Sequence, residues 1–127
     1  MQFGYTILYV EDVPATLAFY GRAFGLSTRY MHESGSYGEL ETGATALAFV
    51  SHALLTQIGK TLQPPQLDKP TSEIALVTDD VAAAVKRAVD AGAKPVQEPT
   101  AMPWGQTIAY VGDCNGFLVE ICTPVSH

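Results

Sequence analysis

The sequence of 127 residues predicts an α+β protein in which one strand–helix–strand–strand–strand unit occurs twice. The first observation is the order of the patterns, because short β-favouring apolar runs surround a single helical pattern in each half of the chain. The second is that the halves stay in step: Tyr5 aligns with Glu73 and Asp12 with Asp80 at one offset, since 73 − 5 and 80 − 12 both give 68. An internal duplication constrains the architecture more strongly than any single motif.

The first unit opens with an apolar, β-favouring run at 3–10, which a helix follows. Asp12 is a natural N-cap, and Pro14 stands in the first helical turn, where its missing N–H group removes no hydrogen bond. Gly25 ends the helix in the usual way. The aromatic residues Phe19, Tyr20 and Phe24 are expected in the core. The apolar positions with helical spacing are Val13, Leu17, Tyr20 and Phe24.

Three strands complete the first unit and are expected at 26–31, 37–40 and 45–50. Turn residues separate them at 34–36 and 41–44.

The segment 51–70 has little periodicity and is rich in glycine and proline. A short helix is expected at His52–Ile58, and the rest is expected to run over the surface. This stretch is either a lid or a connector, and Pro64 with Pro65 favours a stiff connector.

The second unit repeats the pattern. A strand at 72–78 precedes an alanine-rich helix, which Asp80 caps and Gly92 ends. A strand is expected at 94–97, a loop at 99–103 and a closing hairpin at 106–122. The hairpin turn, 112–116, is rich in Gly, Asp and Asn.

One carboxylate, Glu120, lies inside the last apolar strand. Burying a lone carboxylate is costly, so this group must be paired, bound to a ligand or directed into a wet cavity. The alternative is that Glu120 lies on the solvated face of a half-exposed strand.

Composition excludes several functional classes. The net charge of −6 argues against nucleic acid or an acidic membrane as a partner, because both need a basic surface. No apolar run approaches the roughly 20 residues of a membrane span. Cys114 and Cys122 would be roughly 20 Å apart along one strand, too far for a disulfide. With no basic start or cleavage site near the N-terminus, a cytoplasmic location is expected.

A family resemblance rests on motifs that cover nearly the whole chain outside 52–70. The motifs are Leu8-Tyr9-Val10-Glu11-Asp12-Val13, Ala18-Phe19-Tyr20 and Gly25-Leu26 in the first half, and Pro103-Trp104-Gly105-Gln106 and Asp113-Cys114-Asn115-Gly116-Phe117-Leu118-Val119-Glu120 in the second. With two βαβββ units, the chain resembles the vicinal oxygen chelate superfamily, which includes glyoxalase I, extradiol dioxygenases, and fosfomycin and bleomycin resistance proteins.

This resemblance implies an α+β fold with two βαβββ modules forming a cleft lined by curved mixed sheets. It implies a single domain over 1–127, with module 1 at 1–51, a connector at 52–70 and module 2 at 71–127. The two uncovered sheet faces would surround a shared cavity, within one chain or between two chains. The fold hosts both enzymes and drug-binding proteins, so it does not decide the function.

Enzymes of this family bind a divalent metal through the first and last strands of each unit, usually with His, Gln or Glu. The resemblance places Tyr5, Ala48 (or Leu47 if the register shifts by one residue), Glu73 and Glu120 on these positions. Ala and Leu cannot bind a metal, and Tyr is an uncommon ligand there. Two carboxylates would hold Mg²⁺ only weakly. We therefore expect no cofactor, with a divalent metal on Glu73 and Glu120 as the alternative.

None of the histidines falls on these positions, and each is expected to be exposed to solvent: His32, His52 and His127.

Three interpretations of Glu73 and Glu120 are open besides simple exposure of Glu73. The pair is a remnant directed into a wet cavity, or it binds a cationic or hydrogen-bond-donating ligand. In the third interpretation it is a general acid/base pair, whose mutual repulsion raises one pKa toward neutrality.

Aromatic residues are the other candidate contacts. Trp104, the single tryptophan, resembles the side chains that stack on planar ligands in drug-binding members of the family, although plain packing would also explain it. Tyr5 and Tyr9 share one face of their strand by alternation, and the match of Tyr5 to a ligand position suggests that this face lines the cavity. Further candidates are Tyr30, Tyr37 and Tyr110.

The resulting hypothesis is a metal-independent protein of the glyoxalase/bleomycin resistance type. It would bind a small drug-like or aromatic metabolite through Tyr5, Tyr9, Trp104, Glu73 and Glu120, and a homodimer is expected. The alternative is a glyoxalase-like lyase or isomerase with Glu120 and Glu73 as catalytic residues, with or without a divalent metal. A partner-binding protein with a closed cavity is a third option that no sequence feature favours.

Overall fold

Each half of the chain folds into a unit of its own. The computed structural model describes residues 1–125, and these divide into the units Met1–Pro64 and Pro65 onward. Part of the expected connector, 52–64, thus belongs to the first unit, and 65–70 belongs to the second. His127 lies outside the described residues.

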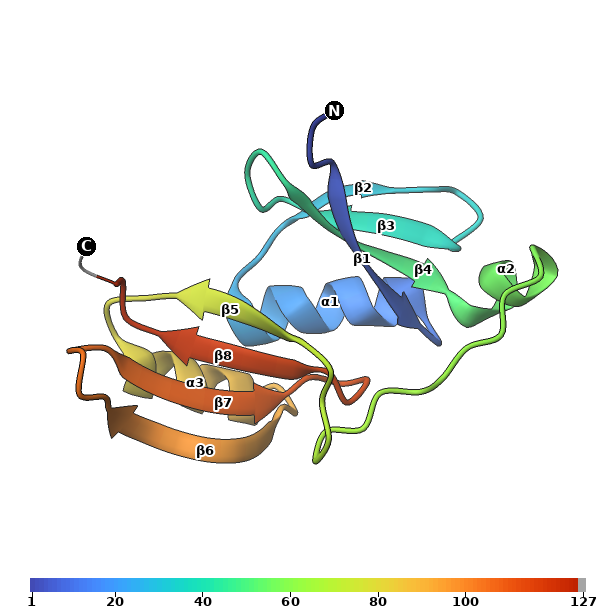
Figure 1. The fold of residues 1–127 in the computed structure, drawn as a ribbon. Coiled ribbons are helices and arrows are strands. Elements are labelled where there is room, and N and C mark those ends of the chain that lie inside the picture. Colours follow the sequence, from blue (N-terminus) through green and yellow to red (C-terminus); the bar gives the residue numbers. More distant parts are fainter. Residues whose placement is uncertain (126–127) are drawn as a thin grey trace. The chain divides into compact units, whose positions relative to one another are not determined.

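The first unit is a four-stranded sheet with one long helix on one face (Figure 1). The strand order is β1-β4-β3-β2, in which β1 runs parallel to β4 and the other pairs are antiparallel. This confirms the predicted βαβββ order. The elements are β1 Tyr5–Val10, α1 Val13–Phe24, β2 Thr28–Met31, β3 Tyr37–Leu40, β4 Ala46–Ser51 and the short α2 His52–Gln57.

Helix α1 begins and ends where its local sequence predicts. The Asp12 carboxylate accepts a hydrogen bond from the Ala15 N–H at 3.0 Å, and Gly25 ends the helix with a left-handed φ of 70°. Tyr20 is fully buried, and its ring lies 5.2 Å from that of Phe49 on β4. The apolar side of α1 therefore packs on the face of the sheet that carries Phe49, which makes this face the core of the unit.

The second unit repeats this arrangement, with strand order β5-β8-β7-β6 and α3 on one face (Figure 1). Strand β5 is parallel to β8, as β1 is to β4. The Asp80 carboxylate accepts from the Ala83 N–H at 3.1 Å, so both helices begin with the same cap. The elements are β5 Glu73–Val77, α3 Val81–Asp90, β6 Lys94–Ala101, β7 Thr107–Gly112 and β8 Leu118–Cys122.

Strand β6 is longer than predicted. The loop expected at 99–103 is wrong in its first part, because the strand continues through Pro99 to Ala101. The reason is that β6 is an edge strand and pairs only with β7, so a proline that lacks an N–H group is tolerated there. Two shifts of register, between Pro95 and Gln97 and between Gln97 and Thr100, absorb the irregularity.

In each unit, the face of the sheet that no long helix covers is the one on which a ligand site could form. On β1, Val10 is completely buried, whereas Tyr5, Ile7 and Tyr9 are exposed on the face away from α1. On β5, the exposed residues Glu73, Ala75 and Val77 alternate with the half-buried Ile74 and Leu76. We call the face of each sheet that lies opposite α1 or α3 its uncovered face.

The register places Ala48, and not Leu47, on the uncovered face. Ala48 pairs with Ile7 on β1 and Glu39 on β3, and Glu120 pairs in the same way with Ala75 on β5 and Tyr110 on β7. Ala48 and Glu120 are thus equivalent positions of the two units.

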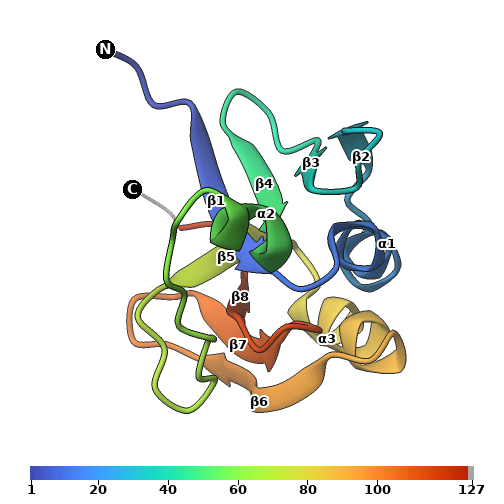
Figure 2. The same ribbon diagram turned by 90° about the vertical axis from the view of Figure 1, so that its right-hand side faces the viewer.

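The segment after β4 begins with the predicted helix, α2, which packs against β4 (Figure 2). The Ser51 hydroxyl caps it by accepting from the Leu54 N–H at 3.1 Å.

Two further expectations concern the whole chain. No disulfide joins the exposed Cys114 to the buried Cys122. Within residues 1–125, no helix has the length and apolarity that a membrane span requires.

Candidate functional site

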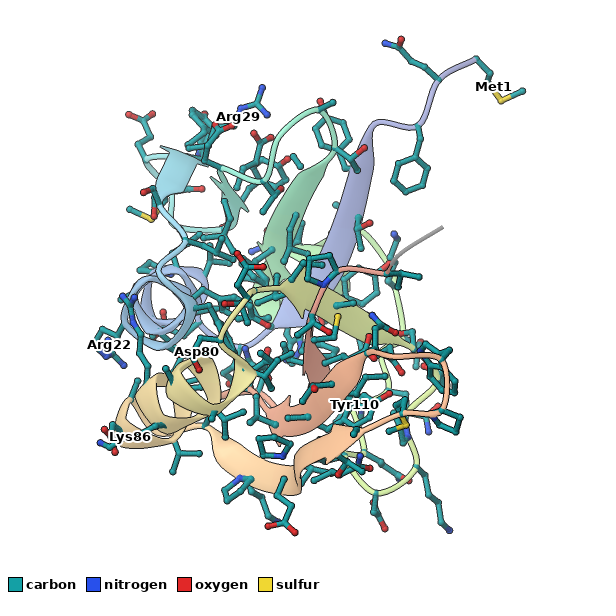
Figure 3. The ribbon with its side chains drawn as sticks, turned by 90° about the vertical axis from the view of Figure 1, so that its left-hand side faces the viewer. Met1, Arg22, Arg29, Asp80, Lys86 and Tyr110 are labelled. Carbon is teal, nitrogen blue, oxygen red and sulfur yellow. The ribbon has the colours of Figure 1, made fainter. Side chains whose placement is uncertain are left out.

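An acidic cluster occupies the uncovered face of the second unit. Three adjacent strands supply it: Glu73 begins β5, Glu120 lies in the middle of β8, and Tyr110 pairs with Glu120 from β7. The Glu73 side chain lies close enough to Tyr110 and Glu120 to raise the pKa of both groups. In Figure 3, Tyr110 lies on the opposite side of its sheet from α3, whose outer surface carries Lys86. We call Glu73, Tyr110 and Glu120 the acidic cluster.

The closeness of two carboxylates determines the electrostatics of the acidic cluster. Glu73 and Glu120 repel each other when both are ionised, and a hydrogen bond between them would need a proton on one of them. Partial burial raises the pKa of Glu120, and the neighbouring Glu73 raises it further through its charge and the hydrogen bond. Glu120 is therefore a weaker acid in the folded protein than an isolated glutamate.

Tyr110 adds a phenol to the acidic cluster. Burial raises the pKa of its phenol, and the charges of Glu120 and Glu73 and the hydrogen bond to Glu73 add to this effect. The phenol thus remains protonated and acts as a donor to Glu73.

Cys122 lies next to the cluster on the same strand as Glu120. Burial raises the pKa of its thiol, and the charges of Glu120 and Glu73 raise it further. A thiol with a raised pKa is a weak nucleophile, so Cys122 contributes an apolar side chain and no reactive thiolate.

The first unit has a different set at the equivalent positions. Tyr5 and Ala48 stand where the second unit has Glu73 and Glu120, and Glu39 stands where it has Tyr110. Its central contact joins Tyr37 to Glu39: the Tyr37 hydroxyl donates to Glu39 Oε2 at 2.5 Å. Burial raises the pKa of Tyr37, and the hydrogen bond and charge of Glu39 raise it further.

Other tyrosines surround this contact and make the uncovered face of the first unit largely aromatic. The ring of Tyr30 lies 6.3 Å from that of Tyr37, and Tyr5 is near enough to interact electrostatically with Tyr37. Arg29 Nε lies 3.8 Å from both Glu39 Oε1 and Glu41 Oε2, a distance at the outer limit of an ion pair.

Tyr9 lies farther along β1, beneath the residues that follow α2. Lys60 Nζ is 5.6 Å from the centre of the Tyr9 ring, within range of a cation–π interaction. Near the same end of β1, His52 Nδ1 lies 3.5 Å from Glu11 Oε2. The start of the connector is therefore held against β1 in the first unit.

Trp104 is on the surface and is held by a short hydrogen-bond chain. Its indole N–H donates to Gln106 Oε1 at 2.7 Å, and the Gln106 amide donates to the Thr123 carbonyl at 2.8 Å. This loop adjoins the end of the sheet where Thr107 bonds Thr123, whereas Glu73 pairs with Leu118 at the other end. Within the second unit, Glu73 and Glu120 thus meet, and Trp104 stands apart from Glu73.

The metal positions of the family can be compared with the donors that each unit supplies. The first unit supplies Tyr5 and Ala48, and the second supplies Glu73 and Glu120. Among residues 1–125, no group of three or more His, Cys, Asp or Glu side chains is placed to hold a metal ion. The pair of the first unit contains an alanine, and neither pair contains a histidine, so neither pair by itself fits a transition metal of this family's enzymes.

The histidines do not change this result. His32 follows β2 in an exposed turn, where its Nδ1 lies 2.7 Å from the Ser34 hydroxyl, and His52 contacts Glu11 at the start of α2.

Sequence reasoning found Glu73 and Glu120 but not the roles of Tyr110 and Glu39. Signals for both were present. The backbone of Asp113 and Phe117 closes the hairpin turn, so counting outward from that pair places Tyr110 opposite Glu120. Tyr37 and Glu39 stand two residues apart in one strand, which puts both on the same face.

Solved structures with the same fold are numerous, and three illustrate the range. A glyoxalase-related enzyme from Fulvimarina pelagi has 23% identity and a TM-score of 0.83, over 98% of this chain and 88% of the other. A glyoxalase/bleomycin resistance protein/dioxygenase family enzyme from Burkholderia phytofirmans PsJN has 23% identity and a TM-score of 0.72, over 94% and 95%. TioX from Micromonospora sp. ML1 has 20% identity and a TM-score of 0.73, over 97% and 98%.

These identities support a common fold only, and no curated protein matches the chain significantly. The family model described as Glyoxalase/Bleomycin resistance protein/Dioxygenase superfamily, however, matches residues 2–121. Together with the two βαβββ units, this match confirms the resemblance that the sequence motifs indicated. The chain belongs to the glyoxalase/bleomycin resistance protein/dioxygenase superfamily, the vicinal oxygen chelate group.

Proposed function

We propose that this protein binds a small organic cation, or a compound with an equivalent hydrogen-bond donor, on the uncovered face of the second unit and without a metal. The observation that carries the proposal is the contact between Glu73 and Glu120 on adjacent strands. An ammonium group beside them would offset their mutual repulsion, and both carboxylates would then be ionised around it. A charge-assisted hydrogen bond of this kind is stronger than a neutral one.

Three further features support a ligand with an apolar, drug-like or aromatic body. Val77, on the same face of β5, is 62% exposed, and Leu118 lies half-buried between Glu73 and Gly112. Taken by itself, the aromatic face of the first unit, with Tyr5 and Tyr9, offers stacking surfaces of its own. Trp104 is exposed at the other end of the second unit's sheet from Glu73, and we propose it as a contact for a ligand long enough to reach it. The net charge of −6 favours a cation over an anion.

We also propose a cytoplasmic homodimer. Exposed apolar side chains on the uncovered face of the first unit, such as Tyr5 and Ile7, would be removed from water between two copies. The absence of a disulfide between Cys114 and Cys122 is compatible with a reducing compartment.

The decisive experiment is calorimetric titration of metal-free protein with benzylamine at pH 7. We expect binding that releases a proton, visible as a heat that depends on the ionisation enthalpy of the buffer. Glu120→Gln and Glu73→Gln should each weaken binding by about tenfold or more, because hydrogen bonds to charged groups contribute about 1.5–3 kcal/mol.

Glu98→Gln is the matched control for this titration. It removes one exposed carboxylate of the same unit on β6 and should leave binding unchanged. The proposal fails if the three variants lose affinity equally, or if benzylamine binds only after a divalent metal is added.

The acidic cluster also favours a second candidate, a glyoxalase-like lyase or isomerase. A carboxylic acid beside a carboxylate can donate one proton and accept another, and the raised pKa of Glu120 brings that proton closer to neutral pH. The discriminating assay is turnover of a hemithioacetal substrate with no metal and with Ni²⁺, Zn²⁺, Mn²⁺ or Mg²⁺. Turnover that Glu120→Gln abolishes would replace the binding function with this one.

A further inference from the structure

The start of the second unit contains a turn that places a leucine against the sheet. The Lys69 N–H donates to the Gln66 carbonyl at 3.0 Å, which puts Leu67 and Asp68 at the centre of the turn. Leu67 is half-buried although its chain neighbours, Gln66 and Asp68, are exposed. We call residues 66–69 the Leu67 turn.

Leu67 lies on Gly112, the last residue of β7. A Cβ atom placed on Gly112 would be 2.5 Å from Leu67 Cδ2 and 3.2 Å from Leu67 Cδ1, so the leucine fills the space above this glycine. Gly112 is buried, and it is not among the glycines with positive φ. Glycine is therefore needed here for room and not for its backbone conformation.

A second contact holds the Leu67 turn in place. A Cβ atom on Gly116, in the turn between β7 and β8, would be 3.7 Å from the Pro65 ring. Pro65 and Leu67 thus lie over two neighbouring glycines of one hairpin. Pro65 restricts the backbone shortly before Leu67, and the Leu67 side chain rests on Gly112. Both the backbone and the side chain of the leucine are therefore held in place.

The face on which Leu67 lies is the face of the acidic cluster. Gly112 is two residues from Tyr110 on β7, so their side-chain directions point to the same side of the sheet. In the register, Gly112 pairs with Leu118, and Leu118 pairs with Glu73. At a strand spacing of about 4.8 Å, Gly112 is about 10 Å from Glu73 across the sheet.

We propose that Leu67 is a specificity-determining residue that forms one wall of the ligand site and limits the size of the ligand's apolar body. This inference rests on the proposed binding function of the acidic cluster and adds a boundary to it. The cationic end of the ligand occupies Glu73, Glu120 and Tyr110. The apolar end extends along Leu118 toward β7, where Leu67 stops it.

The test compares two amines that share a cationic end, benzylamine and the bulkier 1-naphthylmethylamine. Calorimetric titrations use the wild type and Leu67→Ala, with Leu62→Ala as the matched control. Leu62 is also a half-buried leucine of the connector, but it belongs to the first unit. Circular dichroism melting of each variant verifies that it is folded.

Leu67→Ala should shift the affinity ratio of naphthylmethylamine to benzylamine by about tenfold in favour of the larger amine, the change expected when one to two methylene-sized groups of space open. Leu62→Ala should leave this ratio unchanged. Gly112→Ala should shift the ratio in the same direction as Leu67→Ala, because its methyl group displaces the leucine.

The outcomes separate this inference from the proposed function. Suppose that both amines bind, that their binding depends on Glu120, and that Leu67→Ala and Leu62→Ala give the same affinity ratio. The proposed role of Leu67 in specificity is then wrong, and the proposed binding function stands. If neither amine binds the wild type but naphthylmethylamine binds Leu67→Ala, the wall is supported as one that excludes the larger amine. If neither amine binds either protein, the proposed function fails, and the specificity role of Leu67 fails with it.

Discussion

At the scale of single residues, the closeness of the Glu73 and Glu120 carboxylates determines the chemistry of the site. The fold brings two carboxylates into contact on one sheet face and adds Tyr110 as a donor, while Cys122 keeps its proton. Such a pair is poorly stable when both groups are ionised and nothing lies between them. A ligand cation removes this repulsion, which links the binding of ligand to the loss of a proton.

The raised pKa of Glu120 predicts the direction of the pH dependence of stability. The folded state retains a proton that the unfolded state releases near pH 4.5, so the free energy of unfolding should fall as the pH rises from there through the folded pKa. Glu120→Gln should remove this fall and make the protein more stable than the wild type at pH 7. Urea denaturation at pH 4.5 and pH 7 measures the effect.

Glu98→Gln serves as the control for this measurement, since its side chain is exposed on the edge strand. If the wild type lost no stability between the two pH values relative to Glu120→Gln, the pKa of Glu120 would not be raised in the folded protein.

At the scale of elements, the N-termini of the two long helices are the features that local sequence predicts best. Asp12 and Asp80 occupy equivalent positions and cap α1 and α3 with hydrogen bonds of nearly equal length, 3.0 and 3.1 Å. Each cap depends on one local contact between a side chain and the backbone three residues later, so local sequence suffices to predict it.

The paired caps predict equal effects of equivalent substitutions. Asp12→Ala and Asp80→Ala should each lower the free energy of unfolding by about 1 kcal/mol, the usual cost of removing an N-cap. Asp→Asn at either position should cost much less, because the amide oxygen still accepts the bond. Chemical denaturation of the four variants checks this, and a loss in the Asn variants as large as in the Ala variants would assign the effect to charge.

Elements that depend on distant contacts were harder to predict. Pro99 indicated a loop locally, but β6 lies at an edge of its sheet, and the edge position cannot be known before the strand order is known. The Leu67 turn is a stronger case. It lies in a segment without periodicity, and the partner of Leu67 is Gly112, 45 residues later (112 − 67 = 45), so only the folded path of the chain brings the two together.

At the scale of the whole molecule, the duplication made the architecture predictable and the site only partly so. The offset between Tyr5 and Glu73 aligned the metal positions of the family, and the observed register confirms the choice of Ala48 over Leu47. The two halves have nevertheless diverged at these positions: one face carries an acidic pair, and the other carries tyrosines around Glu39. The internal duplication thus predicts the backbone fold of both units. The chemistry of each sheet face depends on which side chains stand at the equivalent positions.

The proposed homodimer gives a prediction at this scale. Ile7, 44% exposed on the uncovered face of the first unit, should be buried between copies, so Ile7→Glu should convert a dimer into a monomer. Sedimentation velocity measures this at several concentrations. Val89→Glu, on the exposed side of α3, is the control and should remain a dimer. A wild type that sediments as a monomer at all concentrations would contradict the proposal.

The edge strand β6 has a consequence for the behaviour of the protein at high concentration. Pro95 and Pro99 remove two backbone donors from this edge, and the shifts of register on either side of Gln97 interrupt its regular pairing. An extended segment from another molecule would therefore find no continuous row of N–H and C=O groups along β6. These features make β6 a poor template for growth of the sheet into cross-β aggregates.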